Sequence, residues 1–90
     1  MQHKTAENLQ FSKILGKLVR KLRQERKGLS CRMLDDAYEL GGNLSRIENG
    51  KINTSITTVY KIAEALDMPF VEFAKLLQDE LGEDFTLIDK

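Results

Sequence analysis

The chain has 90 residues, of which 41% are hydrophobic and 31% charged, a composition typical of one small globular domain rather than a disordered segment. Its fourteen Lys and Arg balance fourteen Asp and Glu, and a net charge of zero argues against a nucleic-acid-binding protein, which usually has a basic excess. The single Cys (Cys31) and single His (His3) exclude an internal disulfide and a metal cluster, no apolar run is long enough to span a membrane, and the N-terminus lacks the apolar core of a signal peptide. We therefore expect a cytoplasmic protein with no metal, cofactor or membrane partner.

Helical periodicity dominates the first half of the chain. A helix is predicted over residues 7–26, ending before Gly28, because apolar residues recur there at spacings of three and four: Ile14, Leu15, Leu18, Val19 and Leu22. Ser30 is the predicted N-cap of a short second helix whose inward positions are Leu34, Tyr38 and Leu40.

The next segment predicts a tight turn and a third helix. Gly41-Gly42-Asn43 is typical of a turn. A short helix is predicted over residues 43–49, with Leu44 and Ile47 inward and Gly50 as its C-terminal stop. The second helix, the turn and the third helix form a helix-turn-helix unit over about residues 30–50.

Two further amphipathic helices follow a polar loop at residues 51–54. Ser55 is the predicted N-cap of a fourth helix with a wide apolar face: Ile56, Val59, Tyr60, Ile62, Ala63 and Leu66. Pro69 suits the first turn of a fifth helix whose apolar positions are Phe70, Phe73, Leu76, Leu77 and Leu81.

The predicted organisation is a single all-α domain of five helices over residues 1–90. Its core spans residues 12–81. Gly82 ends the fifth helix, and residues 82–90 form a short C-terminal tail with β-prone residues at 85–88.

The charge is divided unevenly along the chain. Residues 1–32 have a net charge of +7 and residues 33–90 a net charge of −7. Four basic residues share one face of the predicted first helix: Lys13, Lys17, Arg20 and Lys21. This asymmetry indicates a polarised molecule, and it reverses much of the argument drawn from the net charge.

Resemblance to a known family is strongest in the segment 44–51, which reads Leu-Ser-Arg-Ile-Glu-Asn-Gly-Lys, and in the later Ile-Ala-Glu-Ala-Leu of residues 62–66. With Ser30 and Leu34 upstream, this pattern resembles the phage-repressor and Cro-like (Xre-type) helix-turn-helix family over about residues 14–77. The resemblance implies a compact, five-helix lambda-repressor-like domain that binds DNA.

The resemblance also implies roles for individual residues. In similar proteins an Arg near the end of the first helix pairs with the Glu of the third, which here implies a structural ion pair between Arg23 and Glu48. The third helix lies in the major groove with its first turns facing base edges, and the residues that reach the bases are then Asn43, Ser45 and Arg46. Arg46 is the predicted main reader because Arg binds guanine O6 and N7 in bidentate fashion; the alternative is a solvated charge on an exposed face.

Residues around the third helix are expected to hold the phosphate backbone. They lie in the turn after it and at the N-terminus of the second helix, whose amides and dipole favour an anion. The full set of DNA-binding candidates is Ser30, Cys31, Arg32, Gly42, Asn43, Ser45, Arg46, Asn49, Lys51, Asn53 and Thr54. Taken singly, each is also explained as an ordinary polar loop or cap residue.

The chain departs from the family pattern around the turn. The turn is one residue short, and Gly41 and Gly42 stand where relatives often have long polar side chains. Asp35 replaces a small residue, and Cys31 replaces a common Gln. These departures shift the expected sequence readout toward Asn43, Arg46 and the shape of the DNA.

Cys31 has two interpretations. A thiol at a helix N-terminus has a lowered pKa, which favours a redox sensor. The alternative is a small residue that begins the second helix.

A homodimer is expected, because one helix-turn-helix covers only a half-site and two recognition helices must lie about 34 Å apart. Apolar residues beyond the need of one short helix are the candidate dimer contacts: Phe70, Phe73, Leu77, Leu81 and Phe85. The alternative is that all of them pack internally. The acidic side chains near the C-terminus are predicted to point away from DNA, or to dock on the basic helix of a partner subunit: Asp79, Glu80, Glu83, Asp84 and Asp89.

The predicted function is a sequence-specific transcriptional regulator of bacterial or phage origin, a dimeric repressor that binds a double-stranded DNA operator. A close variant is an antitoxin that regulates its own operon and has a toxin as partner. An alternative of another class is a protein-interaction module that keeps the fold without binding DNA, favoured by the Gly41-Gly42 turn and the acidic second part of the chain. An enzyme is not expected, because no nucleophile–base pair, metal spacing or phosphate loop is present.

Overall fold

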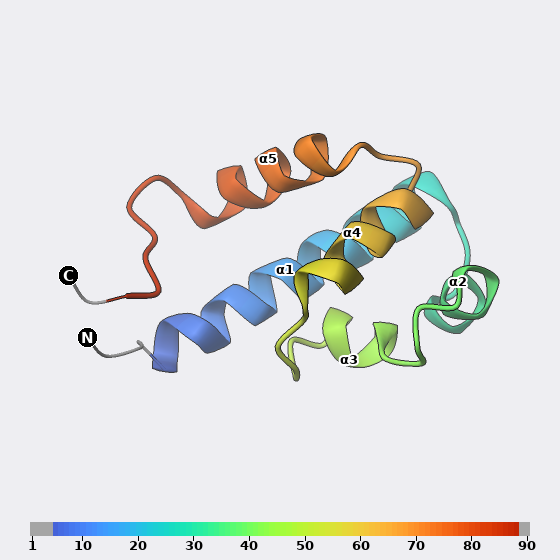
Figure 1. Cartoon of the computed structure of the whole chain (residues 1–90), viewed down its shortest axis with the longest axis horizontal. Helices are drawn as coiled ribbons and strands as arrows, with labels where there is room; N and C mark the ends of the chain where they lie inside the picture. Colours follow the sequence, from blue (N-terminus) through green and yellow to red (C-terminus); the bar gives the residue numbers. More distant parts are fainter. Residues whose placement is uncertain (1–4, 89–90) are drawn as a thin grey trace.

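The structure, a computed structural model, describes residues 5–88, which form five α-helices (Figure 1). Their bounds are Thr5–Arg26 for α1, Cys31–Tyr38 for α2, Leu44–Glu48 for α3, Ile56–Ala65 for α4 and Phe70–Leu81 for α5. The predicted all-α, five-helix fold is confirmed. In the tail, residues 82–87 form turns and loop, and of the β-prone residues 85–88 Ile88 alone takes part in an isolated β-bridge. His3, Lys4 and Asp89 lie outside the described residues.

The ends of the helices follow local sequence signals. The Oγ of Ser30 accepts a hydrogen bond from the Met33 N–H at 3.1 Å, and the Oγ of Ser55 accepts one from the Thr58 N–H at 3.2 Å. Each serine therefore caps its helix as predicted. Shortly after the end of α1, Gly28 takes a φ of 64°, a left-handed conformation that glycine adopts without strain.

Three helices have ends that differ from the prediction. α1 begins two residues before position 7, and α3 is one residue shorter at each end than the predicted 43–49. Pro69 is the N-cap of α5 and not part of its first turn, because its ψ of 141° is extended. Its carbonyl still accepts the Phe73 N–H at 3.1 Å, so Pro69 joins the helix through its carbonyl alone.

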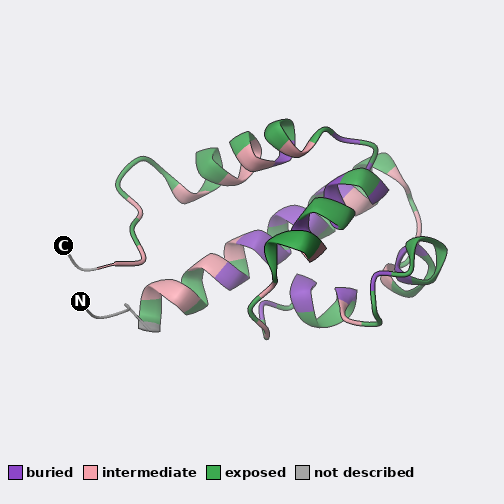
Figure 2. Cartoon of the chain, in the orientation of Figure 1, coloured by how far each residue is buried: buried purple, intermediate pink, exposed green. Residues whose placement is uncertain are grey.

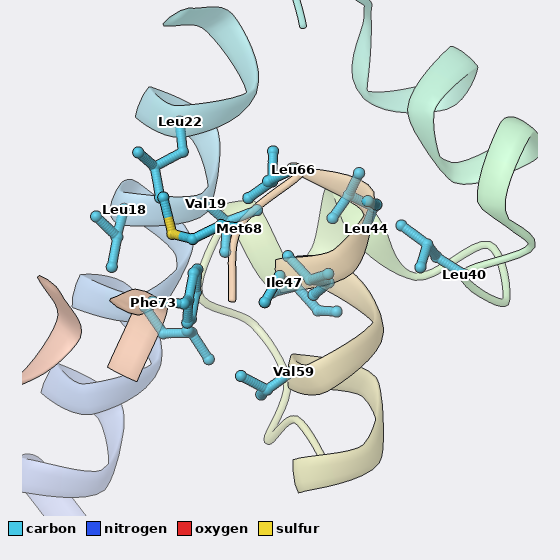
Figure 3. Packing of buried hydrophobic residues seen from close by; sticks show 14 of the residues in the cluster. Leu18, Val19, Leu22, Leu40, Leu44, Ile47, Val59, Leu66, Met68 and Phe73 are labelled. Carbon is cyan, nitrogen blue, oxygen red and sulfur yellow. The ribbon is translucent and has the colours of Figure 1, made fainter. Parts of the chain in front are cut away.

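One hydrophobic cluster takes side chains from all five helices (Figure 3). Figure 2 shows that α1 passes through the middle of the molecule, with its buried positions concentrated in the central part of the helix. α1 packs against both α3 and α5. The largest fully buried side chains are Phe73, Leu34, Leu44, Ile47, Ile62, Leu66 and Val19. None of the helices in the described part is apolar over a length that would cross a membrane.

Three residues predicted to point inward are exposed: Tyr38, Ile56 and Tyr60. On α2 the chain turns after Tyr38, and Leu40 from beyond that turn fills the core position instead. On α4 the apolar face is wider than the core surface it covers. Its inner side is formed by Val59, Ile62, Ala63 and Ala65, which leaves Ile56 with 69% of its surface exposed.

Two glycines let α1 and the end of α3 approach each other at the level of the backbone. A Cβ added at Gly16 would lie 2.3 Å from the Ile47 carbonyl oxygen and 2.6 Å from that of Glu48. A Cβ added at Gly50, where φ is 69°, would lie 2.9 Å from the Cα of Lys13. Since neighbouring backbone atoms cannot move aside as a flexible side chain can, only glycine fits either position and α3 lies directly on α1.

Candidate nucleic-acid interface

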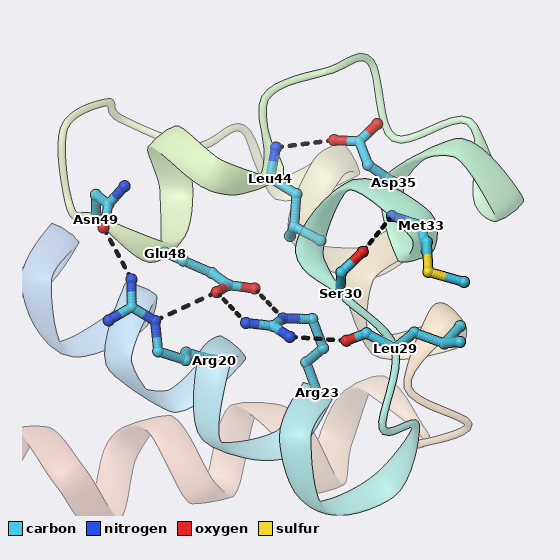
Figure 4. Close-up of polar contacts among 9 residues, drawn as sticks. All are labelled: Arg20, Arg23, Leu29, Ser30, Met33, Asp35, Leu44, Glu48 and Asn49. Carbon is cyan, nitrogen blue, oxygen red and sulfur yellow. Dashed lines mark hydrogen bonds and ion pairs between the residues drawn. The ribbon is translucent and has the colours of Figure 1, made fainter.

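An ion pair joins α1 to α3 (Figure 4). The Nε and Nη2 of Arg23 donate to the two carboxylate oxygens of Glu48 at 2.7 and 2.9 Å, and its Nη1 donates to the Leu29 carbonyl at 2.7 Å. Only 11% of the Arg23 side chain and 2% of the Glu48 side chain are exposed. The hydrogen bonds to Glu48 raise the pKa of Arg23 above its usual range, so the guanidinium stays charged. The structure thus places together the two residues that the family resemblance pairs.

A second arginine of α1 reaches α3 from the more exposed side. The Nε of Arg20 lies 3.4 Å from Oε1 of Glu48, and its Nη2 donates to Oδ1 of Asn49 at 2.8 Å (Figure 4). Arg20 was predicted to lie on the basic face of the first helix, and its contact with Asn49 was not predicted. The available signal was the spacing of three residues from Arg23, which directs both side chains toward the same neighbour.

The turn between α2 and α3 is held by the buried carboxylate of Asp35. Its Oδ1 accepts the Gly42 N–H at 2.8 Å. Its Oδ2 accepts the Leu44 N–H at 2.9 Å, the bond drawn in Figure 4. Asn43 is the N-cap of α3, but its side chain makes no capping hydrogen bond, so Asp35 satisfies an amide at the start of this helix. The Gly42 amide already donates to Asp35, and Gly42 stays a predicted DNA contact through its other atoms. One indication of this role was present in the sequence, because Asp35 stands where the family pattern has a small residue.

The outer side of α3 is formed by polar residues. Ser45, Arg46 and Asn49 are exposed, whereas Leu44 and Ile47 are buried against the core. Ser45 and Asn49 are four residues apart and therefore lie on the same face of the helix. The helix consequently presents a short polar surface whose orientation is set by the contacts on its buried side.

The N-terminus of α2 lies beside the start of α3, across a cleft of about 310 Å³. The cleft is lined by Cys31, Arg32, Asp35, Asp36, Gly42 and Ser45. Arg32 is 92% exposed in its side chain, and its Nε lies 4.0 Å from a carboxylate oxygen of the exposed Asp36. The predicted phosphate site at α2 therefore brings Cys31 and Arg32 close to the third helix, but a carboxylate beside Arg32 weakens the attraction for an anion.

The thiol of Cys31 is half-buried, and its pKa is raised, whereas the pKa of a reactive cysteine is lowered. Burial, reinforced by the carboxylate of Glu48, raises the pKa from its ordinary 9.0 to about 11. A thiol with this pKa stays protonated at neutral pH and lacks the thiolate that reacts with peroxide. The raised pKa argues against the redox-sensor interpretation and favours a small residue that begins α2.

The polar residues of the loop after α3 lie in two different environments, one exposed and one buried. Lys51 and Asn53 are exposed, and the Ser12 hydroxyl donates to Oδ1 of Asn53 at 3.5 Å. The Thr54 hydroxyl is buried, with no hydrogen-bond partner in the part of the chain described. Thr54 lines a cavity of about 320 Å³ between α1, α4 and α5. The buried hydroxyl does not support the predicted phosphate contact of Thr54, which stays a prediction.

The five residues predicted as a dimer surface occupy different environments. Phe73 has no exposed surface, so its assignment as a dimer contact is wrong: it fills the core. Three others line the 320 Å³ cavity: Phe70, Leu77 and Leu81. Phe85 packs on Phe11 with ring centroids 6.1 Å apart, where the tail returns toward the start of α1 (Figure 1). The most exposed apolar side chains of α4 and α5 are instead Ile56, Tyr60 and Val71.

Five helices, a tight turn between α2 and α3, and an α3 fixed on α1 with its polar side outward define a helix-turn-helix protein. A family model described as helix-turn-helix matches residues 19–73, more than half of the chain, and the protein belongs to this family, of the phage-repressor and Cro-like kind. The resemblance seen in the sequence is thereby confirmed. Domains of this family bind DNA and act in regulation. A search of curated proteins found no match.

Proposed function

We propose that this protein is a sequence-specific transcriptional regulator of repressor type that binds a double-stranded DNA operator. The observation that supports the proposal is the outer side of α3. Ser45, Arg46 and Asn49 are exposed there, while the opposite side is held on α1 by the buried Glu48. A helix presented in this way fits the major groove with polar side chains at base edges.

Arg46 is the proposed main reader, and its replacement tests the function directly. Arg46→Ala is expected to relax specificity at one base pair and to weaken binding to the preferred duplex by about 1–3 kcal/mol, because a bidentate contact to guanine is lost. Selection of bound sequences from a random DNA library, followed by titration of the selected duplex, measures both effects. Lys75→Ala, an exposed charge on α5, serves as the control. An equal loss of affinity for every sequence would place Arg46 among the phosphate contacts instead.

A protein-interaction module is the second candidate, because acidic groups lie at the surface proposed for DNA. Asp36 is exposed beside Arg32, and Gly41 and Gly42 offer no side chains at the start of α3. The two candidates differ in salt dependence. A DNA-binding protein loses affinity for duplex DNA steeply as salt rises, with a slope of about −0.9 per phosphate contact, whereas the second candidate shows no such binding.

We also propose that the protein dimerises through the exposed apolar residues of α4 and α5. Tyr60 stacks on Phe70 with ring centroids 5.3 Å apart, and this aromatic surface lies near Lys61 and Glu64 of the same helix. Two copies related by a twofold axis can bring the Lys of one opposite the Glu of the other. The occupant that fits this surface is therefore a second copy of the chain.

Tyr60→Ser is expected to shift the protein from dimer to monomer in sedimentation at tens of micromolar, because it removes the aromatic surface shared by the two copies. Tyr38→Ser is the matched control, since Tyr38 is an exposed tyrosine on α2. A wild-type protein that sediments as a monomer at this concentration would contradict the dimer.

A further inference from the structure

Three basic residues follow one face of α1: Lys13, Lys17 and Arg20. Spacings of four and three residues place them in line over about 10 Å of the helix. All three are exposed. Within the described part of the chain, Lys13 and Lys17 have no hydrogen bond or ion pair. We refer to these three residues as the basic stripe.

The basic stripe runs beside the end of α3. At one end, the backbone and side-chain stem of Lys13 pack against Gly50, where an added Cβ would lie 2.9 Å from Cα and 3.0 Å from Cγ of Lys13. At the other end, Arg20 donates to Asn49 at 2.8 Å. Both ends therefore contact the two residues that directly follow α3.

Asn49 connects the basic stripe with the outer side of α3. It lies four residues after Ser45 on the same face of the chain, and its N–H donates to the Ser45 carbonyl at 3.0 Å. A polar surface thus continues from Ser45 through Asn49 to Arg20 and then along α1. A duplex seated on α3 would meet positive charge next to the groove that the helix occupies.

We propose that the basic stripe is a second phosphate-binding surface, which holds the backbone of the duplex beside the half-site contacted by α3. This inference rests on the proposed DNA-binding function. Lys13 and Lys17 supply ammonium groups that neutralise phosphates, and Arg20 orients Asn49 at the junction. The family match begins at residue 19, so both lysines lie on a part of α1 that precedes it.

The competing occupant of the basic stripe is an acidic segment of a second copy of the chain. Glu80 of α5 lines a cleft of about 280 Å³ together with Lys17 and Lys21, so carboxylates border the other flank of α1. The geometry favours DNA, because the two ends of the stripe contact Asn49 and Gly50 after α3 and not α5.

A charge-matched pair of double variants tests the stripe. Lys13→Gln/Lys17→Gln removes two charges from it, and Lys21→Gln/Lys75→Gln removes two exposed charges from the flank of α1 that borders Glu80 and from α5. Binding of the full chain to a random-sequence DNA duplex is measured by fluorescence anisotropy between about 50 and 200 mM salt. The stripe variant is expected to flatten the salt slope by about 1.8, so that its affinity falls about 12-fold less across this range than that of wild type. The control variant is expected to keep the wild-type slope, and both should keep the wild-type melting temperature.

Each of the remaining outcomes contradicts the inference, and each points to a different explanation. An equal change of slope in both double variants means that only the net charge matters. An unchanged slope in the stripe variant, with wild type still binding, removes the stripe and leaves the proposed function standing. A wild-type protein without salt-dependent binding to DNA removes the proposed function itself. A stripe variant with normal DNA binding but an altered sedimentation coefficient assigns the stripe to the acidic segment of a second copy.

Discussion

Arg23→Ala is expected to lower the free energy of unfolding by about 3–5 kcal/mol, because it leaves a buried carboxylate without its main partner. The Glu48 side chain is 2% exposed, and after the substitution the cation that remains near its carboxylate is Arg20, whose Nε lies 3.4 Å away. The carbonyl of Leu29 loses its donor as well. Equilibrium unfolding in denaturant, followed by circular dichroism, measures the loss.

Two comparison variants separate the buried ion pair from a general effect of charge. Arg32→Ala removes an exposed arginine that lies 4.0 Å from Asp36, and it should change stability by no more than about 1 kcal/mol. Arg23→Met combined with Glu48→Leu should recover much of the loss, because an apolar pair needs no compensation for buried charge. An unchanged melting temperature for Arg23→Ala would show that the pair does not hold α3 to α1.

Asp35→Ala is expected to cost about 2–4 kcal/mol, because the amides of Gly42 and Leu44 lose a charged acceptor and the Leu44 amide is buried. The start of α3 should then fray, since Asn43 provides no side-chain cap. Equilibrium unfolding measures the cost, and hydrogen exchange at the amide of Leu44 measures the fraying.

Asp36→Ala is the matched control, because it removes the same charge from the neighbouring exposed position. It should leave stability nearly unchanged. Asp35→Asn keeps one acceptor oxygen and should fall between wild type and Asp35→Ala. Equal losses for Asp35→Ala and Asp36→Ala would show that the charge of α2, and not the hydrogen bonds to the turn, is responsible.

Local sequence patterns predicted the helices well, because their signals lie within a few residues of one another. Ser30 and Ser55 each accept a hydrogen bond from the amide three residues later, and this geometry is complete within one turn. The pairing of Arg23 with Glu48 is a long-range contact. It was available only through the family resemblance, which supplies the relative placement of α1 and α3.

Features that depend on the distance between segments could not be derived from periodicity. An apolar stripe shows which side of a helix faces inward but not how far the covered surface extends, and Ile56 and Tyr60 therefore lie outside the core. Asp35 was visible in the sequence as a departure from the family pattern. Its bonds to Gly42 and Leu44 depend on how the turn folds back over α2, which no local pattern specifies.

The glycine contacts at Gly16 and Gly50 also concern the mechanics of binding. Helices that meet through interdigitated side chains adjust to a ligand by changing rotamers, but α1 and the end of α3 have no such layer between them at these points. α3 therefore cannot tilt against α1 without a clash between backbones. In the proposed complex with DNA, the adjustment would then come from the duplex, through bending and changes in groove width. The affinity of the protein for different operators would then depend partly on the stiffness of base steps that it never contacts.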